Sequence, residues 1–380
     1  MDRSRRAVRR AQPSEALMRD RNIMLTPGPT PLPPQVLEAM SRPLFHHRTE
    51  KFGRLFAQVI SDMKWVYRTS GSVLMMTSSG TGAMESAVVN LLSPGDATLV
   101  CTTGVFGDRF VAIHKAYGLA PEVLPSEWGR AVDPDALRRT LKGKPGLKAV
   151  FFQHTDTSTG VLNDIKTLAR IVREESGALV VVDSVSGLAC EPLETDAWGL
   201  DAVLTGSQKG LMNAPGLGFA AVGERARKAS DEAKLPRFNF DWRLMQKSLA
   251  DRETPWTPAI SIVAGQAAAL QLLRAEGMEN VWKRHVGLAA HARRLLQEKL
   301  GLPFYAKDPA NILTGVVLPQ GVDGVKLLAD ILREDGISIA GGQLGLKGKI
   351  FRLAHMGYIS KADIDAGVDA LARRLVGAKA

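Results

Sequence analysis

The fold of this chain is indicated by one stretch, ALVVVDSVSGLACEPLETDAWGLDAVLTGSQKG (Ala178–Gly210). It starts with the continuous apolar segment Ala178–Asp183, which is typical of a strand buried on both faces of a parallel sheet. A second predicted strand, Asp201–Thr205, follows, and Lys209 comes shortly after it. Because ligands of open parallel sheets bind where the strands end, the acid and the lysine are expected at one functional edge.

Apolar segments alternate with helical segments on both sides of this stretch. The other predicted strands are Ser72–Met76, Ala97–Cys101, Ala149–Gln153 and Gly218–Val222. The predicted helices are Lys51–Tyr67, Gly82–Leu92, Asp108–Tyr117 and Ile165–Glu175. This alternation is typical of an α/β fold in which helices cover both faces of a mostly parallel sheet.

A long helical region, Ile260–Leu300, follows and is predicted to break near Gly277. Beyond it, strands and helices alternate again on a smaller scale. We therefore expect three parts. An arginine-rich N-terminal arm covers residues 1–21, a large domain covers 22–278, and a small C-terminal α/β domain covers 279–380.

Composition and charge exclude several classes of function. The 380-residue chain has a formal net charge of +10, and seven arginines of the arm contribute to this excess. Outside the arm no basic stripe is interleaved with aromatic residues, which argues against nucleic-acid binding. No apolar run approaches the roughly 18 residues of a membrane span. Cys101 and Cys190 form no metal-ligand pattern, so we expect reduced thiols and a cytoplasmic location.

The segment TSSGTGAMES (residues 77–86) lies between a predicted strand and a predicted helix. Its residues Ser79, Gly80 and Thr81 offer hydroxyl groups and free backbone N–H groups at the start of the helix, which suits a phosphate. The pattern lacks the first glycine of a dinucleotide fingerprint and the Gly-Lys-Ser/Thr ending of a P-loop. A hydroxyl-rich helix cap without a ligand is the alternative interpretation.

Asp183 and Lys209 admit two interpretations. A buried carboxylate needs a partner, and an ordinary salt bridge with the lysine would supply one. A pyridoxal phosphate (PLP) site is the other, because that cofactor needs a lysine for its Schiff base, a carboxylate for its ring nitrogen and a phosphate cradle. It also needs a flat group against its ring, and Phe106 in GVFGDR (residues 104–109) is placed to supply it.

The sequence resembles the class V aminotransferases of PLP-dependent fold type I, near the alanine–glyoxylate, serine–glyoxylate and pyridoxamine–pyruvate transaminases. The resemblance covers roughly residues 22–376. The motifs that carry it are LTPGPTPLPP, SSGTGAMES, GVFGDR, HTDTSTGVLND, VVVDSVSGL, DAVLTGSQKGLMNAPGLGF, TPWTPAIS and FRLAHMG. It implies a large domain with a mostly parallel seven-stranded sheet and a smaller C-terminal α/β domain.

The resemblance also implies roles for the residues of these motifs. Lys209 would form the Schiff base and move the proton of the substrate, and Asp183 would pair with the pyridine nitrogen. Phe106 would stack on one face of the ring, at a position where relatives carry Trp or Tyr. Val185 would lie against the opposite face. The residues implied for the phosphate are Ser79, Gly80, Thr81 and Gln208.

Four further roles follow from the same resemblance. Thr257 would reach the phosphate from the partner subunit, which makes a homodimer part of the site. Thr157 would approach the cofactor hydroxyl O3′. Arg352 would grip the substrate carboxylate, a task that suits its planar guanidinium. Gly28 would close over the substrate side of the site.

The activity implied is transfer of an amino group from a small amino acid, alanine or serine, to a small 2-oxo acid, glyoxylate or pyruvate. A 2-aminoethylphosphonate or pyridoxamine–pyruvate transaminase is the alternative. A non-catalytic protein of this fold is disfavoured because Lys209 and Asp183 are both present. A cysteine desulfurase is disfavoured because residues 191–380 contain no cysteine.

The run His46-His47-Arg48 resembles a metal or catalytic cluster. No third ligand with metal-binding spacing accompanies it, so we expect a polar loop near the mouth of the site and no metal. The run receives no specific role, and neither does the arginine-rich arm.

Overall fold

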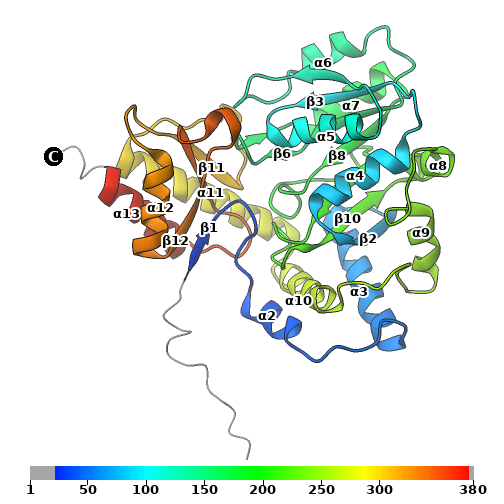
Figure 1. Cartoon of the computed structure of the whole chain (residues 1–380), viewed down its shortest axis with the longest axis horizontal. Coiled ribbons are helices and arrows are strands. Elements are labelled where there is room, and N and C mark those ends of the chain that lie inside the picture. The colour runs from blue at the N-terminus through cyan, green and yellow to red at the C-terminus, as the bar shows by residue number, and fades with distance from the viewer. Residues whose placement is uncertain (1–21, 376–380) are drawn as a thin grey trace, which may run out of the picture.

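A computed structural model of the chain describes residues 22–375, and the arginine-rich arm lies outside them. The larger of its sheets has seven strands in the order β2-β10-β9-β8-β5-β3-β4 (Figure 1). β10 is antiparallel to both of its neighbours, and the other pairs are parallel, as predicted. In sheet order the strands are β2 (Ser72–Ser78), β10 (Gly216–Val222), β9 (Ala202–Gly206), β8 (Leu179–Asp183), β5 (Ala149–Gln153), β3 (Thr98–Thr102) and β4 (Glu122–Pro125).

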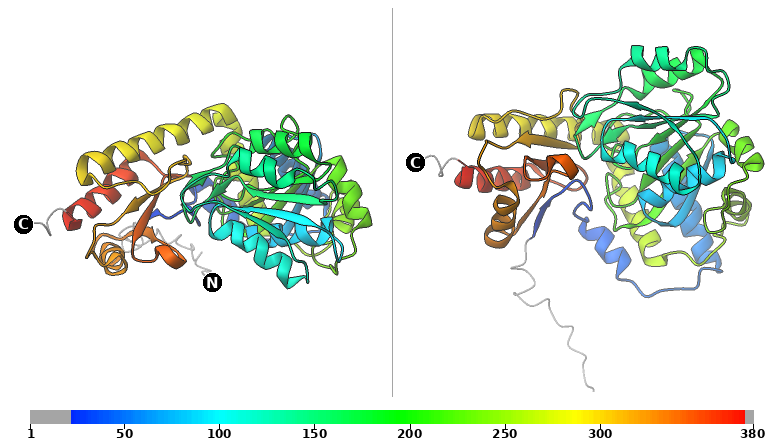
Figure 2. Two further views of the ribbon diagram at one scale, coloured as in Figure 1. Left: turned by 90° about the horizontal axis from the view of Figure 1, so that it is seen from above. Right: turned by 45° about the horizontal axis from the view of Figure 1, so that its top comes forward.

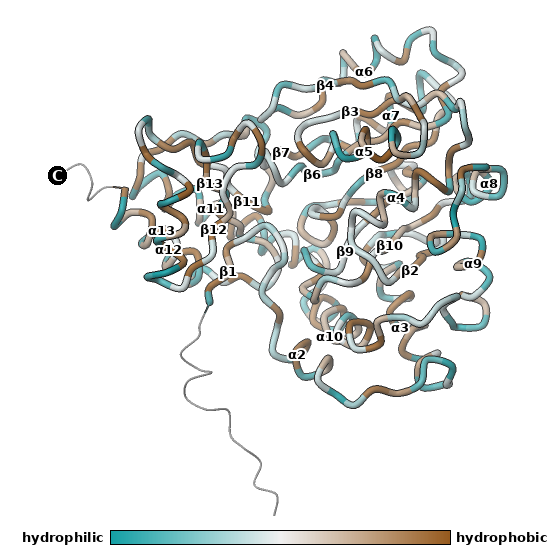
Figure 3. Tube along the Cα trace, viewed as in Figure 1, coloured by the Kyte–Doolittle hydropathy of each residue, from teal (hydrophilic) through white to brown (hydrophobic). Residues whose placement is uncertain are grey.

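Helices cover both faces of this sheet, and each face has its own apolar core. The helices over one face are α3 (Glu50–Tyr67), α6 (Pro134–Leu141), α7 (Ile165–Glu175) and α10 (Ile260–Glu276). Those over the other are α4 (Gly80–Leu91), α5 (Val105–Ala116), α8 (Glu224–Glu232) and α9 (Trp242–Ala250). In Figure 3 the colour of α8, at the outer edge, is mostly hydrophilic.

The continuous apolar run of β8 is explained by these two cores. Val180 and Val182 belong to one core, whereas Leu179 and Val181 belong to the other. Successive side chains of a strand point to opposite faces, so a strand covered on both sides is apolar at every position. This confirms the interpretation of ALVVVD as a strand buried on both faces.

The smaller sheet has four strands in the order β1-β12-β13-β11. Its strands are β1 (Ile23–Leu25), β12 (Ile337–Gly341), β13 (Ile350–Ala354) and β11 (Leu313–Val317). Its helices are α11 (Met278–Leu300), α12 (Gly324–Asp335) and α13 (Lys361–Leu375), and they lie together to one side of the large sheet (Figure 2). β1 pairs with β12, so the start of the described chain adds a strand to the C-terminal sheet. The domain boundaries 22–278 and 279–380 stay predictions.

The predicted helical break is confirmed, because α10 ends and α11 begins at Gly277, whose φ of +82° favours glycine. Several short elements were not predicted from the sequence. They are β1, β4, β12, α6, α8 and α9, together with the hairpin of β6 (Thr155–Asp156) and β7 (Val161–Leu162) and the 3₁₀ turn η1 (Leu344–Leu346). α2 (Pro34–Met40) precedes α3.

Candidate active site

The carboxyl edge of the large sheet brings Asp183 and Lys209 into one buried site. β8 and β9 pair in parallel with Asp183 opposite Leu204, so the chain after both strands emerges at the same edge. Asp183 is 3% exposed. Within residues 22–375 its carboxylate accepts one hydrogen bond, from the Val185 backbone N–H at 2.8 Å. Burial raises the pKa of Asp183 to about 7, and the negative charge of Asp156 acts in the same direction.

Lys209 forms no salt bridge with Asp183. Its Nζ donates instead to the backbone carbonyl of Pro27, and the side chain is 9% exposed. Gly28 packs directly on this side chain, because a Cβ at position 28 would lie 2.3 Å from Lys209 Nζ. Burial lowers the pKa of Lys209 to about 8, while Asp183 opposes this change. The salt-bridge interpretation of the pair is therefore excluded, and both groups keep capacity for a ligand.

The start of α4 gathers the residues predicted to form the phosphate cradle. Ser79 caps the helix, since its Oγ accepts from the Gly82 N–H at 3.3 Å. A Cβ on Gly80 would lie 2.7 Å from the Val185 methyl groups, so Val185 packs against this turn. A Cβ on Gly206 would lie 2.8 Å from Gln208 Oε1 and 3.1 Å from the Gly80 N–H nitrogen. Gln208 Oε1 is buried without a partner in the described chain, next to the helix start.

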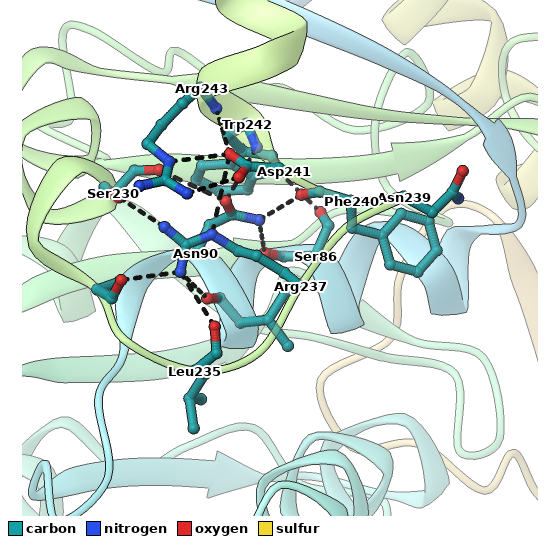
Figure 4. A network of polar contacts seen from close by, with 12 residues as sticks. Ser86, Asn90, Ser230, Leu235, Arg237, Asn239, Phe240, Asp241, Trp242 and Arg243 are labelled. Carbon is teal, nitrogen blue, oxygen red and sulfur yellow. Dashed lines mark hydrogen bonds and ion pairs between the residues drawn. The ribbon is translucent and has the colours of Figure 1, made fainter. Parts of the chain in front are cut away.

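The far end of α4 is anchored by a network of polar contacts (Figure 4). Asn90 Nδ2 donates to the Phe240 carbonyl at 2.6 Å, and Asn90 Oδ1 accepts from the Trp242 N–H at 2.9 Å. Arg237 donates to the Val89 carbonyl at 3.1 Å. The segment 237–242 therefore binds along α4 and holds the helix whose first turn is the predicted cradle.

Phe106 lies in the first turn of α5, which begins three residues earlier than the predicted Asp108. Asp156 Oδ2 accepts hydrogen bonds from the N–H groups of Phe106 and Gly107 at 3.0 and 3.3 Å. Ser158 Oγ accepts from the Val105 N–H at 3.0 Å. These distant side chains cap a helix that has no side-chain cap of its own at Gly104. The start predicted from the local pattern was wrong for this reason.

Thr157 and Arg352 meet where the two sheets approach one another. Arg352, on β13, donates from Nη1 to the Thr157 carbonyl at 2.7 Å and from Nε to the Gly341 carbonyl at 2.8 Å. Three of its five N–H groups are left for a ligand. The residue is 6% exposed, and burial lowers its pKa to about 10, with Asp156 acting in the opposite direction. The structure thus places a buried cation with spare donors beside the predicted cofactor residues.

Thr257 is the predicted site residue that stands apart from this cluster. It is exposed, in the loop between α9 and α10. Arg48 holds this loop, donating to the carbonyls of Thr254 at 2.9 Å and Pro255 at 3.3 Å. The His-His-Arg run therefore lies beside the loop that carries Thr257. Within residues 22–375 no group of three or more His, Cys, Asp or Glu side chains is arranged to hold a metal ion.

Two residues of the site were missed from the sequence although both lie in quoted motifs. Asp156, in HTDTSTG, is fully buried and links the start of α5 to the Thr157 turn. Arg109, in GVFGDR, donates to Thr81 Oγ1 at 2.9 Å. The available signal was a charged residue close to a predicted contact, since Asp156 precedes Thr157 and Arg109 comes three positions after Phe106.

Comparison with known proteins places this chain in a family. The sequence profile described as Aminotransferase class-V matches residues 23–365. The chain belongs to the class V aminotransferases. It is therefore a transaminase that depends on PLP, and its fold is fold type I, as the resemblance implied.

Three relatives show the range of proteins that this chain is similar to. A protein of Synechococcus sp. described as the small subunit of a soluble hydrogenase is 39% identical, with 93% of each chain covered. The serine–glyoxylate aminotransferase of Methylorubrum extorquens is 32% identical, covering 90% of this chain and 88% of the relative. The crystal structure of an alanine–glyoxylate aminotransferase from Nostoc sp. superposes with a TM-score of 0.89 at 30% identity, covering 93% and 94%.

The residues present fit PLP. The Lys209 amine and the Asp183 carboxylate lie at one edge without pairing with each other, and the buried amide of Gln208 has an unpartnered oxygen at the start of α4. Phe106 is half-buried and its backbone is held by Asp156. These are the acid, amine, anion cradle and flat side chain that the cofactor requires.

Proposed function

We propose that this class V aminotransferase moves the amino group of alanine or serine to glyoxylate or pyruvate. The observation that carries the proposal is Arg352, a buried guanidinium with three N–H groups free for a carboxylate. A bidentate pair of this kind suits the one group that amino acids and 2-oxo acids share. The relatives named for serine and alanine as donors and glyoxylate as acceptor support the same choice.

The surroundings of Lys209 favour a small substrate. The Pro27 carbonyl and the α-carbon of Gly28 lie against the amine, and even a methyl group at position 28 would collide with it. Little room is left on this side for a long substrate side chain. We propose that Gly28 closes the substrate side of the site in this way.

Bound PLP supplies an electron-accepting ring that lets an amino group and an α-proton be moved. Lys209 would move that proton at Nζ, a step that needs the neutral amine. Burial favours the neutral form because it lowers the pKa of Lys209 to about 8. Asp183 would hold the proton on the ring nitrogen. Arg352 would orient the substrate carboxylate, and Thr157 would lie toward the cofactor hydroxyl.

Phe106 and Val185 are proposed to hold the two ring faces. The phosphate would be bound by residues at the start of α4 and after β9, namely Ser79, Gly80, Thr81 and Gln208. We further propose a homodimer in which Thr257 of one subunit reaches the phosphate of the other, since Thr257 is exposed on a loop that Arg48 holds in place. Both cysteines are free and buried, which suits the cytoplasm.

The test is the first half-reaction of the PLP-loaded enzyme. Alanine, serine, aspartate, 2-aminoethylphosphonate and pyridoxamine are each mixed with it, and the visible absorption of the bound cofactor is followed. We expect rapid loss of this absorption with alanine or serine, and its return with glyoxylate or pyruvate. Reaction with 2-aminoethylphosphonate or pyridoxamine alone would contradict the proposed substrates.

A further inference from the structure

The proposed phosphate site has an unusual charge balance. The phosphate ester of PLP carries nearly two negative charges at neutral pH. Every residue proposed for it, Ser79, Gly80, Thr81, Gln208 and the partner's Thr257, is neutral. The start of α4 contributes only the partial positive charge of a helix N-terminus. A buried dianion without a cation is costly, so the surroundings of the cradle need to be searched for one.

Arg109 is the cation that touches the cradle. It lies on α5, and its Nη1 donates to Thr81 Oγ1 at 2.9 Å. Its guanidinium carbon also lies 4.6 Å from the centre of the Phe106 ring. One side chain therefore contacts two predicted cofactor residues on two different helices. Burial raises the pKa of Asp183 and lowers that of Lys209, and the positive charge of Arg109 acts toward a lower pKa at both groups, as expected of a cation close to the site.

The direction of the contact with Thr81 matters. A threonine hydroxyl has one proton to donate and lone pairs that accept. When Arg109 occupies a lone pair of Thr81, the hydroxyl proton is left to point elsewhere. An anion at the start of α4 is a suitable acceptor for it, whereas a hydroxyl without this contact would be free to turn its lone pairs toward the anion.

We propose that Arg109 is the cationic member of the phosphate site, and that it orients the Thr81 hydroxyl to donate to the phosphate. It is a positioning residue that acts through Thr81 and adds its charge to the cradle. Its contact with Phe106 places it between the phosphate end and the ring face of the cofactor. This inference rests on the PLP site described under the proposed function.

The experiment compares PLP with pyridoxal, which has the same ring but no phosphate. Dissociation constants of the full-length apoprotein for both ligands are measured by fluorescence titration, for wild type, Arg109→Gln, Arg109→Lys and Arg170→Gln. Arg170, an exposed arginine of α7 that pairs with Glu174, is the matched control. We expect Arg109→Gln to weaken PLP about tenfold to a hundredfold, as for the loss of a charge-assisted contact. Pyridoxal binding should stay within twofold, and Arg109→Lys should recover part of the loss.

A double-mutant cycle tests whether Arg109 acts through Thr81. Thr81→Val alone should weaken PLP, and adding Arg109→Gln to it should weaken PLP by less than the product of the two single effects. Equal weakening of PLP and pyridoxal by Arg109→Gln would show that Arg109 only supports the Phe106 ring, and would overturn the inference. Unchanged PLP affinity, or independent effects in the cycle, would overturn it as well. If wild type bound pyridoxal as tightly as PLP, the proposed phosphate site itself would be wrong, an outcome distinct from failure of Arg109 alone and from failure of the amino-donor test of the proposed function.

Discussion

The two ends of strands β8 and β9 carry buried carboxylates in opposite surroundings. At the amino edge, Asp201 accepts from Arg173 Nη2 at 2.7 Å and from the Val180 N–H at 2.7 Å, and Arg225 lies 3.4 Å away. At the carboxyl edge, Asp183 accepts one backbone hydrogen bond within the described chain. The two side chains are 4% and 3% exposed, and burial raises the pKa of both.

This difference separates a structural carboxylate from one that awaits a ligand. Burial alone does not distinguish them, because it is the same for both. The distinguishing quantity is the number of donors that the folded chain already supplies. A buried acid with few donors is costly to keep unless something else pairs with it, and the partner proposed for Asp183 is the ring nitrogen of PLP.

The largest effect is expected from Lys209→Ala at the carboxyl edge. Without the amine, transamination should fall by at least about a thousandfold, because proton transfer by a positioned base contributes about 10²–10⁴ and covalent attachment of the cofactor is lost too. The apoprotein should unfold at the same temperature or higher, since a buried cation is removed. Turnover within tenfold of wild type would contradict the role of Lys209.

Replacing each of the two acids by its amide tests directly whether Asp183 serves activity and Asp201 serves stability. Asp183→Asn should lower kcat/KM by about a hundredfold or more without lowering the free energy of unfolding of the apoprotein. Asp201→Asn should leave kcat/KM within about twofold and lower the free energy of unfolding by about 2–3 kcal/mol, because contacts to charged groups are lost. Steady-state kinetics and urea unfolding at pH 8 measure both quantities. The distinction fails if the two variants lose activity and stability in the same proportion.

A third change tests the spare donors of Arg352. Arg352→Lys keeps a positive charge but loses the planar fork that matches a carboxylate. We expect KM for the amino donor to rise about tenfold to a hundredfold, as a lost charge-assisted pair of 1.5–3 kcal/mol implies, with a smaller change in kcat. The dissociation constant for PLP, which has no carboxylate, serves as the control. A similar loss of PLP affinity would show that Arg352 acts on the fold rather than on the carboxylate.

The arrangement of Asp183 and Lys209 at the carboxyl edge could be predicted from the sequence because short local patterns determine the strands that carry them there. The run ALVVVD is apolar at every position, so the strand had to be covered on both faces, and the parallel neighbour brought Lys209 to the edge where Asp183 ends its strand. The cradle at Ser79 followed similarly from a glycine and hydroxyl groups between a strand and a helix.

Other parts could not be predicted because distant residues determine them. α5 begins at Val105 since Asp156 and Ser158, about fifty positions away, cap it. β1 joins the C-terminal sheet through its pairing with β12, which no local pattern indicates. The short helices α6, α8 and α9 were missed, although α6 and α9 begin at Asp caps that local reading could have used. The role proposed for Thr257 involves a second chain, so a single sequence and a single folded chain do not test it.

The smallest expected effect sharpens the comparison without any assay of activity. Burial raises the pKa of Asp183 to about 7 in the folded apoprotein, against about 3.9 in an unfolded chain. Between these values the folded state binds more protons than the unfolded state, so this carboxyl makes the free energy of unfolding fall as the pH rises, and the loss is complete above the folded pKa.

Asparagine does not titrate, so Asp183→Asn removes this contribution. Relative to wild type, the variant apoprotein should therefore gain up to about 2 kcal/mol in unfolding free energy between pH 5 and 6.5, at 1.36 kcal/mol per pKa unit. Taking the difference between the two proteins cancels all other titrating groups. PLP should abolish the gain, because the bound ring nitrogen gives the Asp183 carboxylate the partner that it lacks in the apoprotein. A difference between the two apoproteins that does not change with pH would mean that the folded state does not raise the pKa of Asp183, and would contradict the account of an unpaired buried acid.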